Sequence, residues 1–144
     1  RKLAHARLAD GSAWKKFQEM VKAQGGDPTS LEKAGPGGLP VSSRRITWKS
    51  PKKGYLSRMD AREMGLLLVE LGGGRKKAED RVNPGVGMVF HRKLGSKVAV
   101  GDPLVTVYAP EGDMAPLEAR FREALTFSPS RPRLPKLILD AGSK

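Results

Sequence analysis

The sequence has 144 residues, with 27 Lys and Arg against 15 Asp and Glu, and a formal net charge of +12. This length is typical of one compact domain with its own hydrophobic core, and the basic balance attracts polyanions without identifying one. The sequence has no cysteine, which excludes disulfides, thiolate nucleophiles and Cys-ligated metal sites and fits an intracellular protein.

The first 40 residues show helical patterns followed by a loop. Residues 1–9 predict a helix, and because no capping residue precedes Arg1 we expect the chain to be a piece of a longer one. Ser12 is the expected N-cap of a second helix, which Gly25 should end in the left-handed conformation. Apolar residues recur in this helix at helical spacing, at Ala13, Trp14, Phe17, Met20 and Val21. Residues 27–40, rich in Gly and Pro, are expected to form a connector.

From residue 45 onward the pattern becomes β-rich. Residues 46–48 and 54–59 predict strands, and residues 86–108 predict further strands separated by Gly and Pro turns. This pattern indicates a small antiparallel or barrel-like unit. A final helix is expected to begin near Pro116. Its apolar residues should lie on one side, at Leu117, Phe121 and Leu125.

Residues 60–71 predict a helix with a strong start signal. Asp60 is the expected N-cap, and Glu63 could reach back to the Asp60 amide in a capping box. The apolar positions of this helix are expected to enter the core, at Met64, Leu67, Leu68 and Leu71. Residues 72–74, all glycine, should stop it, with at least one at positive φ. Three cations follow these glycines, but the negative end of a helix disfavours anions, so we predict a helix cap and not a phosphate site.

Side chains that could carry chemistry are few. His5 and His91 have no partner at metal-ligand spacing, and the sequence lacks a phosphate-binding loop and a nucleophile elbow. We predict no catalytic, cofactor-binding or metal-binding residue in this chain. The basic residues are dispersed in short groups, so nucleic-acid binding is not expected. Because the longest apolar run, residues 65–69, cannot span a bilayer, we expect a soluble, cytoplasmic protein without membrane contact.

Three stretches together resemble one family, the thymidine and pyrimidine-nucleoside phosphorylases, in their C-terminal region. The resemblance covers nearly the whole chain and depends on the order and spacing of the glycines. The first stretch consists of residues 11–13, Phe17, Met20 and residues 24–28; the second of residues 54–56, 59–60 and 71–75; the third of Asp80, residues 86–87 and 94–95, Val98, Gly101 and residues 103–104.

The resemblance implies an α+β fold, with a helical preamble followed by a β-rich α/β-hammerhead, barrel-sandwich-like unit with packed helices. It implies three segments: residues 1–40 belong to the parent α/β domain, residues 41–128 form the hammerhead-like domain, and residues 129–144 form a tail with a possible short strand at residues 137–139. The parent enzyme would be a pentosyltransferase that converts a pyrimidine (deoxy)nucleoside and phosphate into the free base and (deoxy)ribose 1-phosphate.

In this family the groups that bind phosphate and the base lie upstream, in motifs that match no position of this sequence. The resemblance therefore implies an inactive segment without a cofactor, whose co-substrate phosphate binds elsewhere. Its expected partners are the N-terminal remainder of the phosphorylase and a second subunit in a homodimer. Two alternatives remain open: a carrier-like or interaction module with a barrel-sandwich surface, or a weak nucleic-acid-binding domain. The carrier alternative requires a lysine that biotin or lipoate would acylate, and residues 58–60, where it is expected, contain none.

Overall fold

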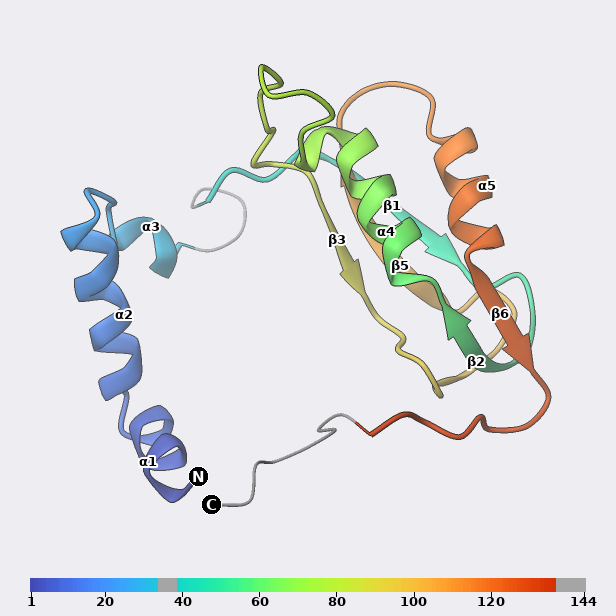
Figure 1. Cartoon of the computed structure of the whole chain (residues 1–144), viewed down its shortest axis with the longest axis horizontal. Helices are drawn as coiled ribbons and strands as arrows, with labels where there is room; N and C mark the ends of the chain where they lie inside the picture. The colour runs from blue at the N-terminus through green and yellow to red at the C-terminus, as the bar shows by residue number, and fades with distance from the viewer. Residues whose placement is uncertain (34–38, 137–144) are drawn as a thin grey trace. The chain divides into compact units, whose positions relative to one another are not determined.

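The computed structural model of the chain describes residues 1–33 and 39–136. The contacts divide the chain into two compact units, Arg1–Val41 (unit 1) and Ser42–Lys144 (unit 2), which Figure 1 shows. The expected strand at residues 137–139 lies outside the described residues. In the described part, no helix is long and apolar enough to cross a membrane.

Unit 1 contains three helices, α1 (Lys2–Ala9), α2 (Ser12–Ala23) and the short α3 (Thr29–Glu32). The two predicted helices are confirmed, but two details differ. Ser12 is not the N-cap of α2: the Asp10 carboxylate accepts a hydrogen bond from the Ser12 amide at 2.8 Å, and Gly11 turns the chain at a φ of 76°. The connector is not entirely a loop, because Asp27 accepts from the Thr29 amide at 2.9 Å where α3 begins.

Unit 1 has no buried residue among those the structure describes. The apolar side of α2 is open, with Trp14 and Met20 each 47% exposed and Phe17 40% exposed. The rings of Trp14 and Phe17 stack on each other at 5.6 Å. As predicted, Gly25, two residues after the end of α2, adopts the left-handed conformation, with a φ of 81°. Because helix stability in proteins comes mainly from packing of an apolar face, unit 1 lacks the burial that would stabilise it alone.

Unit 2 contains two three-stranded antiparallel sheets. The first has the order β1-β5-β3, formed by β1 (Arg44–Lys49), β5 (Pro103–Ala109) and β3 (Gly87–Phe90). The second has the order β4-β2-β6, formed by β4 (Lys97–Val98), β2 (Gly54–Met59) and β6 (Leu125–Ser128). The predicted antiparallel, β-rich body is thus confirmed, and together with the helices it makes the fold α+β.

The strand β6 was not predicted from the sequence. Leu125 was expected to extend the last helix, but α5 (Ala115–Glu123) ends before it and Leu125 opens β6. The β-branched and aromatic Thr126 and Phe127 suit a strand. In the structure they pair with β2, with Leu56 opposite Phe127 and Met59 opposite Leu125.

The helix α4 (Ala61–Leu68) continues into a π-helical turn, η1 (Val69–Gly73). Asp60 caps α4 as predicted, because its Oδ1 accepts from the amides of Arg62 and Glu63, both at 3.1 Å. The reciprocal bond from Glu63 was wrongly expected. The Asp60 amide donates instead to the carbonyl of Ala124 at 3.0 Å, so the start of α4 is tied to the end of α5.

The core of unit 2 lies between the sheets and the helices α4 and α5, which lie side by side (Figure 1). Its largest fully buried side chains are Trp48, Phe121, Leu56, Leu67, Val105 and Val107. The Trp48 and Phe121 rings pack with centroids 5.0 Å apart. Met64 and Leu71 are also buried, as expected, whereas Leu68 is only half-buried. The Leu68 side chain lies against Gly73 of the π-helical turn that directly follows it.

Gly72 ends this helical segment with a φ of 95°, which confirms the expected left-handed glycine. Its carbonyl accepts a hydrogen bond from the Asn83 amide at 2.8 Å. The cap therefore joins the end of η1 to the segment that leads into β3.

Two glycine substitutions in this helix should change stability in opposite directions. Gly72→Ala should destabilise unit 2 by about 1–2 kcal/mol, because an L-residue pays that much in the left-handed conformation. Gly65 lies within α4 with open space around its α-carbon, so Gly65→Ala should stabilise by about 0.5–1 kcal/mol. Urea unfolding of the two variants measures both changes. A Gly72→Ala variant as stable as the parent would show that the left-handed conformation of Gly72 is not required.

Candidate functional site

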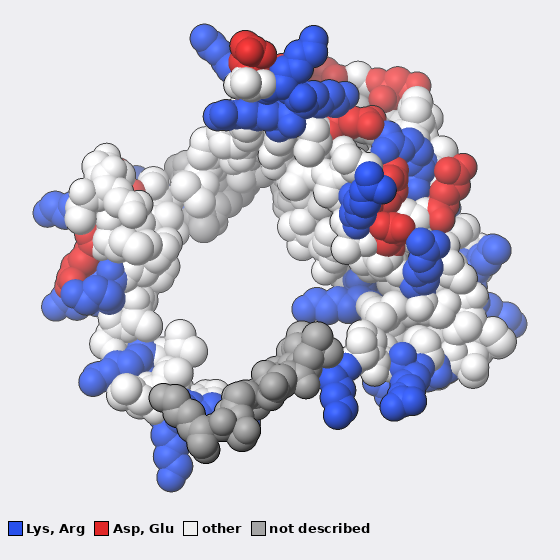
Figure 2. All heavy atoms as spheres, viewed as in Figure 1, with Lys and Arg blue, Asp and Glu red and all other residues white. Residues whose placement is uncertain are grey.

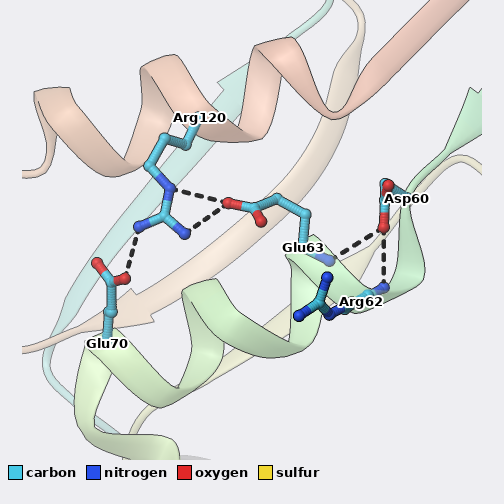
Figure 3. Close-up of polar contacts among 5 residues, drawn as sticks. All are labelled: Asp60, Arg62, Glu63, Glu70 and Arg120. Atoms are coloured by element: carbon cyan, nitrogen blue, oxygen red, sulfur yellow. Dashed lines mark hydrogen bonds and ion pairs between the residues drawn. The ribbon is translucent and has the colours of Figure 1, made fainter.

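The most organised group of charged side chains in the described part is the Arg120 cluster, made of Arg120, Glu63 and Glu70 (Figure 3). The Nε and Nη2 of Arg120 donate to Oε1 of Glu63 at 2.8 and 2.5 Å. Its Nη1 donates to Oε1 of Glu70 at 2.5 Å. One guanidinium on α5 is thus shared by two carboxylates from α4 and η1.

The helices place these groups together. Glu63 and Glu70 are seven residues apart, which is close to two helical turns, so they project from the same face. That face carries Glu63 and Glu70 toward α5, where Arg120 lies between them (Figure 3). The partners are 57 and 50 residues apart in the sequence. No local pattern could have identified this contact, and the sequence assigned Glu63 to a different partner.

The hydrogen bonds of the cluster favour the ionised forms of Glu70 and Arg120. The hydrogen bond from Arg120 lowers the pKa of Glu70 below its ordinary value. The bonds to Glu70 and then Glu63 raise the pKa of the Arg120 guanidinium. A carboxylate with a lowered pKa and a fixed guanidinium are poor proton carriers near neutral pH. The cluster therefore supports helix packing and not acid–base chemistry.

An open pocket of about 310 Å³ lies beside the Arg120 cluster. Its lining residues are Arg58, Asp60, Glu63, Arg120, Glu123 and Ala124. Both arginines already have carboxylate partners. The Nη2 of Arg58 lies 2.9 Å from Oδ2 of Asp60, and Arg120 is shared by the carboxylates of the Arg120 cluster. The pocket lining carries three carboxylates against these two arginines, so it has no excess positive charge. The pocket is therefore poorly suited to bind an anion.

The basic turn after Gly72 also has an internal partner. The amides of Lys76 and Lys77 both donate to Oδ2 of Asp80, at 2.8 and 2.9 Å. Adjacent amides of this kind can bind an anion, but here the anion is a side chain of the same loop. This arrangement supports the cap interpretation of the turn.

The two histidines lie far apart in the sequence and in different units. His5 lies in α1, and His91 follows β3 with its Nε2 2.8 Å from the Thr106 hydroxyl. Within residues 1–33 and 39–136, no three His, Asp or Glu side chains are grouped closely enough to hold a metal ion. That this chain supplies no catalytic, cofactor-binding or metal-binding residue stays a prediction.

The Arg120 cluster should make stability depend on pH in the acid range. Because the folded-state pKa of Glu70 is lowered, its contribution is present above the ordinary value of about 4.5 and is lost as the pH falls through the folded value. Glu70→Gln should therefore destabilise by about 0.2–1 kcal/mol at pH 7, the usual worth of an exposed pair. Below the folded pKa the variant and the parent should be equally stable.

Denaturant unfolding at pH 7 and in acid, with Glu79→Gln as control, measures this dependence. Glu79 forms no ion pair within 4 Å in the described part, so its variant should match the parent at every pH. A stability gap for Glu70→Gln that persists unchanged into acid would show that the effect is not ionic.

Comparison with known proteins identifies the family of this fold. Residues 55–128 match the family described as the pyrimidine nucleoside phosphorylase C-terminal domain. The proteins named pyrimidine-nucleoside phosphorylase in Staphylococcus aureus strains USA300 and NCTC 8325 / PS 47 are each 31% identical to the chain over 121 residues. These residues are 84% of this chain but 28% of each relative. The chain thus belongs to the family of pyrimidine nucleoside phosphorylase C-terminal domains.

Proposed function

We propose that this chain is the C-terminal structural domain of a pyrimidine-nucleoside phosphorylase. The parent enzyme, a pentosyltransferase, would convert a pyrimidine (deoxy)nucleoside and phosphate into the free base and (deoxy)ribose 1-phosphate. The observation that carries the proposal is the match over 84% of the chain to proteins of that name, of which it covers 28%. The segment would have a structural role, and the remaining part of the enzyme would bind the substrates and catalyse the reaction.

The chemistry of phosphorolysis supports this division of roles. The reaction needs free donors for a phosphate dianion and a donor for the departing base. In the described part, Arg120 and Arg58 are paired with carboxylates, and the Lys76 and Lys77 amides bind Asp80. These groups are therefore engaged in holding the domain together. We propose that phosphate and nucleoside bind outside this chain, without a cofactor.

The open face of α2 supports an N-terminal partner. Trp14, Phe17 and Met20 are each at least 40% exposed, and a stripe of large apolar side chains of this kind usually marks a contact surface. We propose that the N-terminal remainder of the phosphorylase covers it, so that residues 1–40 complete the parent α/β domain. Residues 41–128 would then form the hammerhead-like unit and residues 129–144 the tail. A homodimeric, cytoplasmic enzyme belongs to the same proposal.

Grafting tests the function directly. The chain replaces its matching region in the Staphylococcus aureus pyrimidine-nucleoside phosphorylase, and release of base from thymidine and uridine is followed with and without phosphate. The chain alone should release no base, because we place the phosphate and base sites in the remainder of the enzyme. The graft should show phosphate-dependent release of base together with the pentose 1-phosphate.

The relative without its C-terminal region is the matched control and should be inactive or unstable. Phosphate-dependent release by the isolated chain would overturn the assignment of the active site to the remainder. A folded graft with no more activity than the truncated control would show that this chain does not perform the role of the family's C-terminal domain.

A further inference from the structure

Three segments of unit 2 that are distant in the sequence bring exposed cations to one end of the β4-β2-β6 sheet. We call this surface the basic end; it consists of Lys52, Lys53, Lys93, Lys97, Arg131 and Arg133. Lys52 and Lys53 directly precede β2, where Gly54 pairs with Val98 of β4. Along β2, the next residue, Tyr55, pairs with Lys97 on one side and Ser128 on the other.

The segment after β6 closes the basic end. The Leu134 side chain packs against Gly95, so tightly that a β-carbon on Gly95 would lie 2.7 Å from it. This contact brings Arg131 and Arg133 close to the turn that carries Lys93 and Lys97. Neighbouring strands are about 4.8 Å apart, and Lys97 of β4 lies opposite Tyr55, two residues after Lys53. Cations from the three segments can therefore face one extended ligand.

These six cations have no acidic partner within 4 Å in the described part. The nearby carboxylate of Asp102 lies 3.6 Å from Arg92 instead. Figure 2 shows Lys and Arg without Asp or Glu over the lower part of unit 2, whereas the two signs of charge mix around α4 and α5. Clustered like charges repel each other and weaken folding, so the fold gains nothing from this arrangement.

We propose that the basic end binds the phosphate backbone of single-stranded nucleic acid. Cations from three segments can follow a backbone, and Tyr55, half-buried between Lys97 and Ser128, offers a ring on which a base can stack. An anionic membrane is disfavoured, because this end is built from strands and turns and lacks the amphipathic helix with which proteins enter the lipid interface. The scattered cations of the sequence become a binding surface only after folding.

Fluorescence anisotropy of the full chain with a labelled 20-residue oligouridylate tests the proposal. The variant Lys52→Glu/Lys97→Glu changes the net charge by four units at the basic end. The control Lys76→Glu/Lys77→Glu makes the same change in the turn after η1. In 50 mM salt the variant at the basic end should weaken binding of the oligonucleotide about tenfold or more, and the control variant less than about threefold. Losing two phosphate contacts should also reduce the salt slope by about 1.4.

Tyr55→Leu separates stacking from charge. It should weaken binding of the oligouridylate about fivefold or more while leaving the salt slope unchanged. Melting curves of each variant confirm that the fold is retained. Equal weakening by the two charge-reversal variants would overturn the proposal, because it would show a general effect of net charge. Absence of saturable binding by the parent chain, or tighter binding to phosphatidylserine vesicles than to the oligonucleotide, would overturn it as well.

Discussion

The fold of unit 2 depends on one strand, β5, which lies at the centre of the first sheet and is buried along most of its length. Val105 pairs with Trp48 of β1 on one side and with Phe90 of β3 on the other. A shift of one residue in either pairing would exchange the two faces of the strand. The same register carries Trp48 to Phe121, and so fixes where α5 packs.

The charged side chains of unit 2 fall into two groups. Where α5 meets α4, Arg120 is held by Glu63 and Glu70, so its charge stabilises the packing of the helices. At the far end of the second sheet the cations are presented without carboxylate partners in the described residues. Internal pairing suits a structural domain of a phosphorylase, and free cations suit a surface that meets a polyanion. One small domain can carry both, because they lie on different elements.

The sequence predicted what is decided locally. The strand β2, the helix α4 with its Asp60 cap, and the left-handed Gly72 all follow from patterns a few residues long. What it missed depends on residues far apart in the sequence. The strand β6 forms by pairing with β2, about 70 residues earlier. Glu63 accepts hydrogen bonds from Arg120 and does not form the expected bond with the Asp60 amide. The basic end belongs to this second class, because strand pairing and the contact of Leu134 with Gly95 bring its three segments to one end of the sheet only in the folded protein.

We propose that unit 2 folds on its own around β5, whereas unit 1 is stabilised by the N-terminal remainder of the phosphorylase. Hydrogen exchange of the isolated chain tests it most directly, because amides in a cooperative core exchange only on global unfolding. The amides of β5 and β2 should share the highest protection, and those of α2 should exchange orders of magnitude faster. Protection of α2 equal to that of β5 would contradict the claim, because it would show that unit 1 is already stably packed.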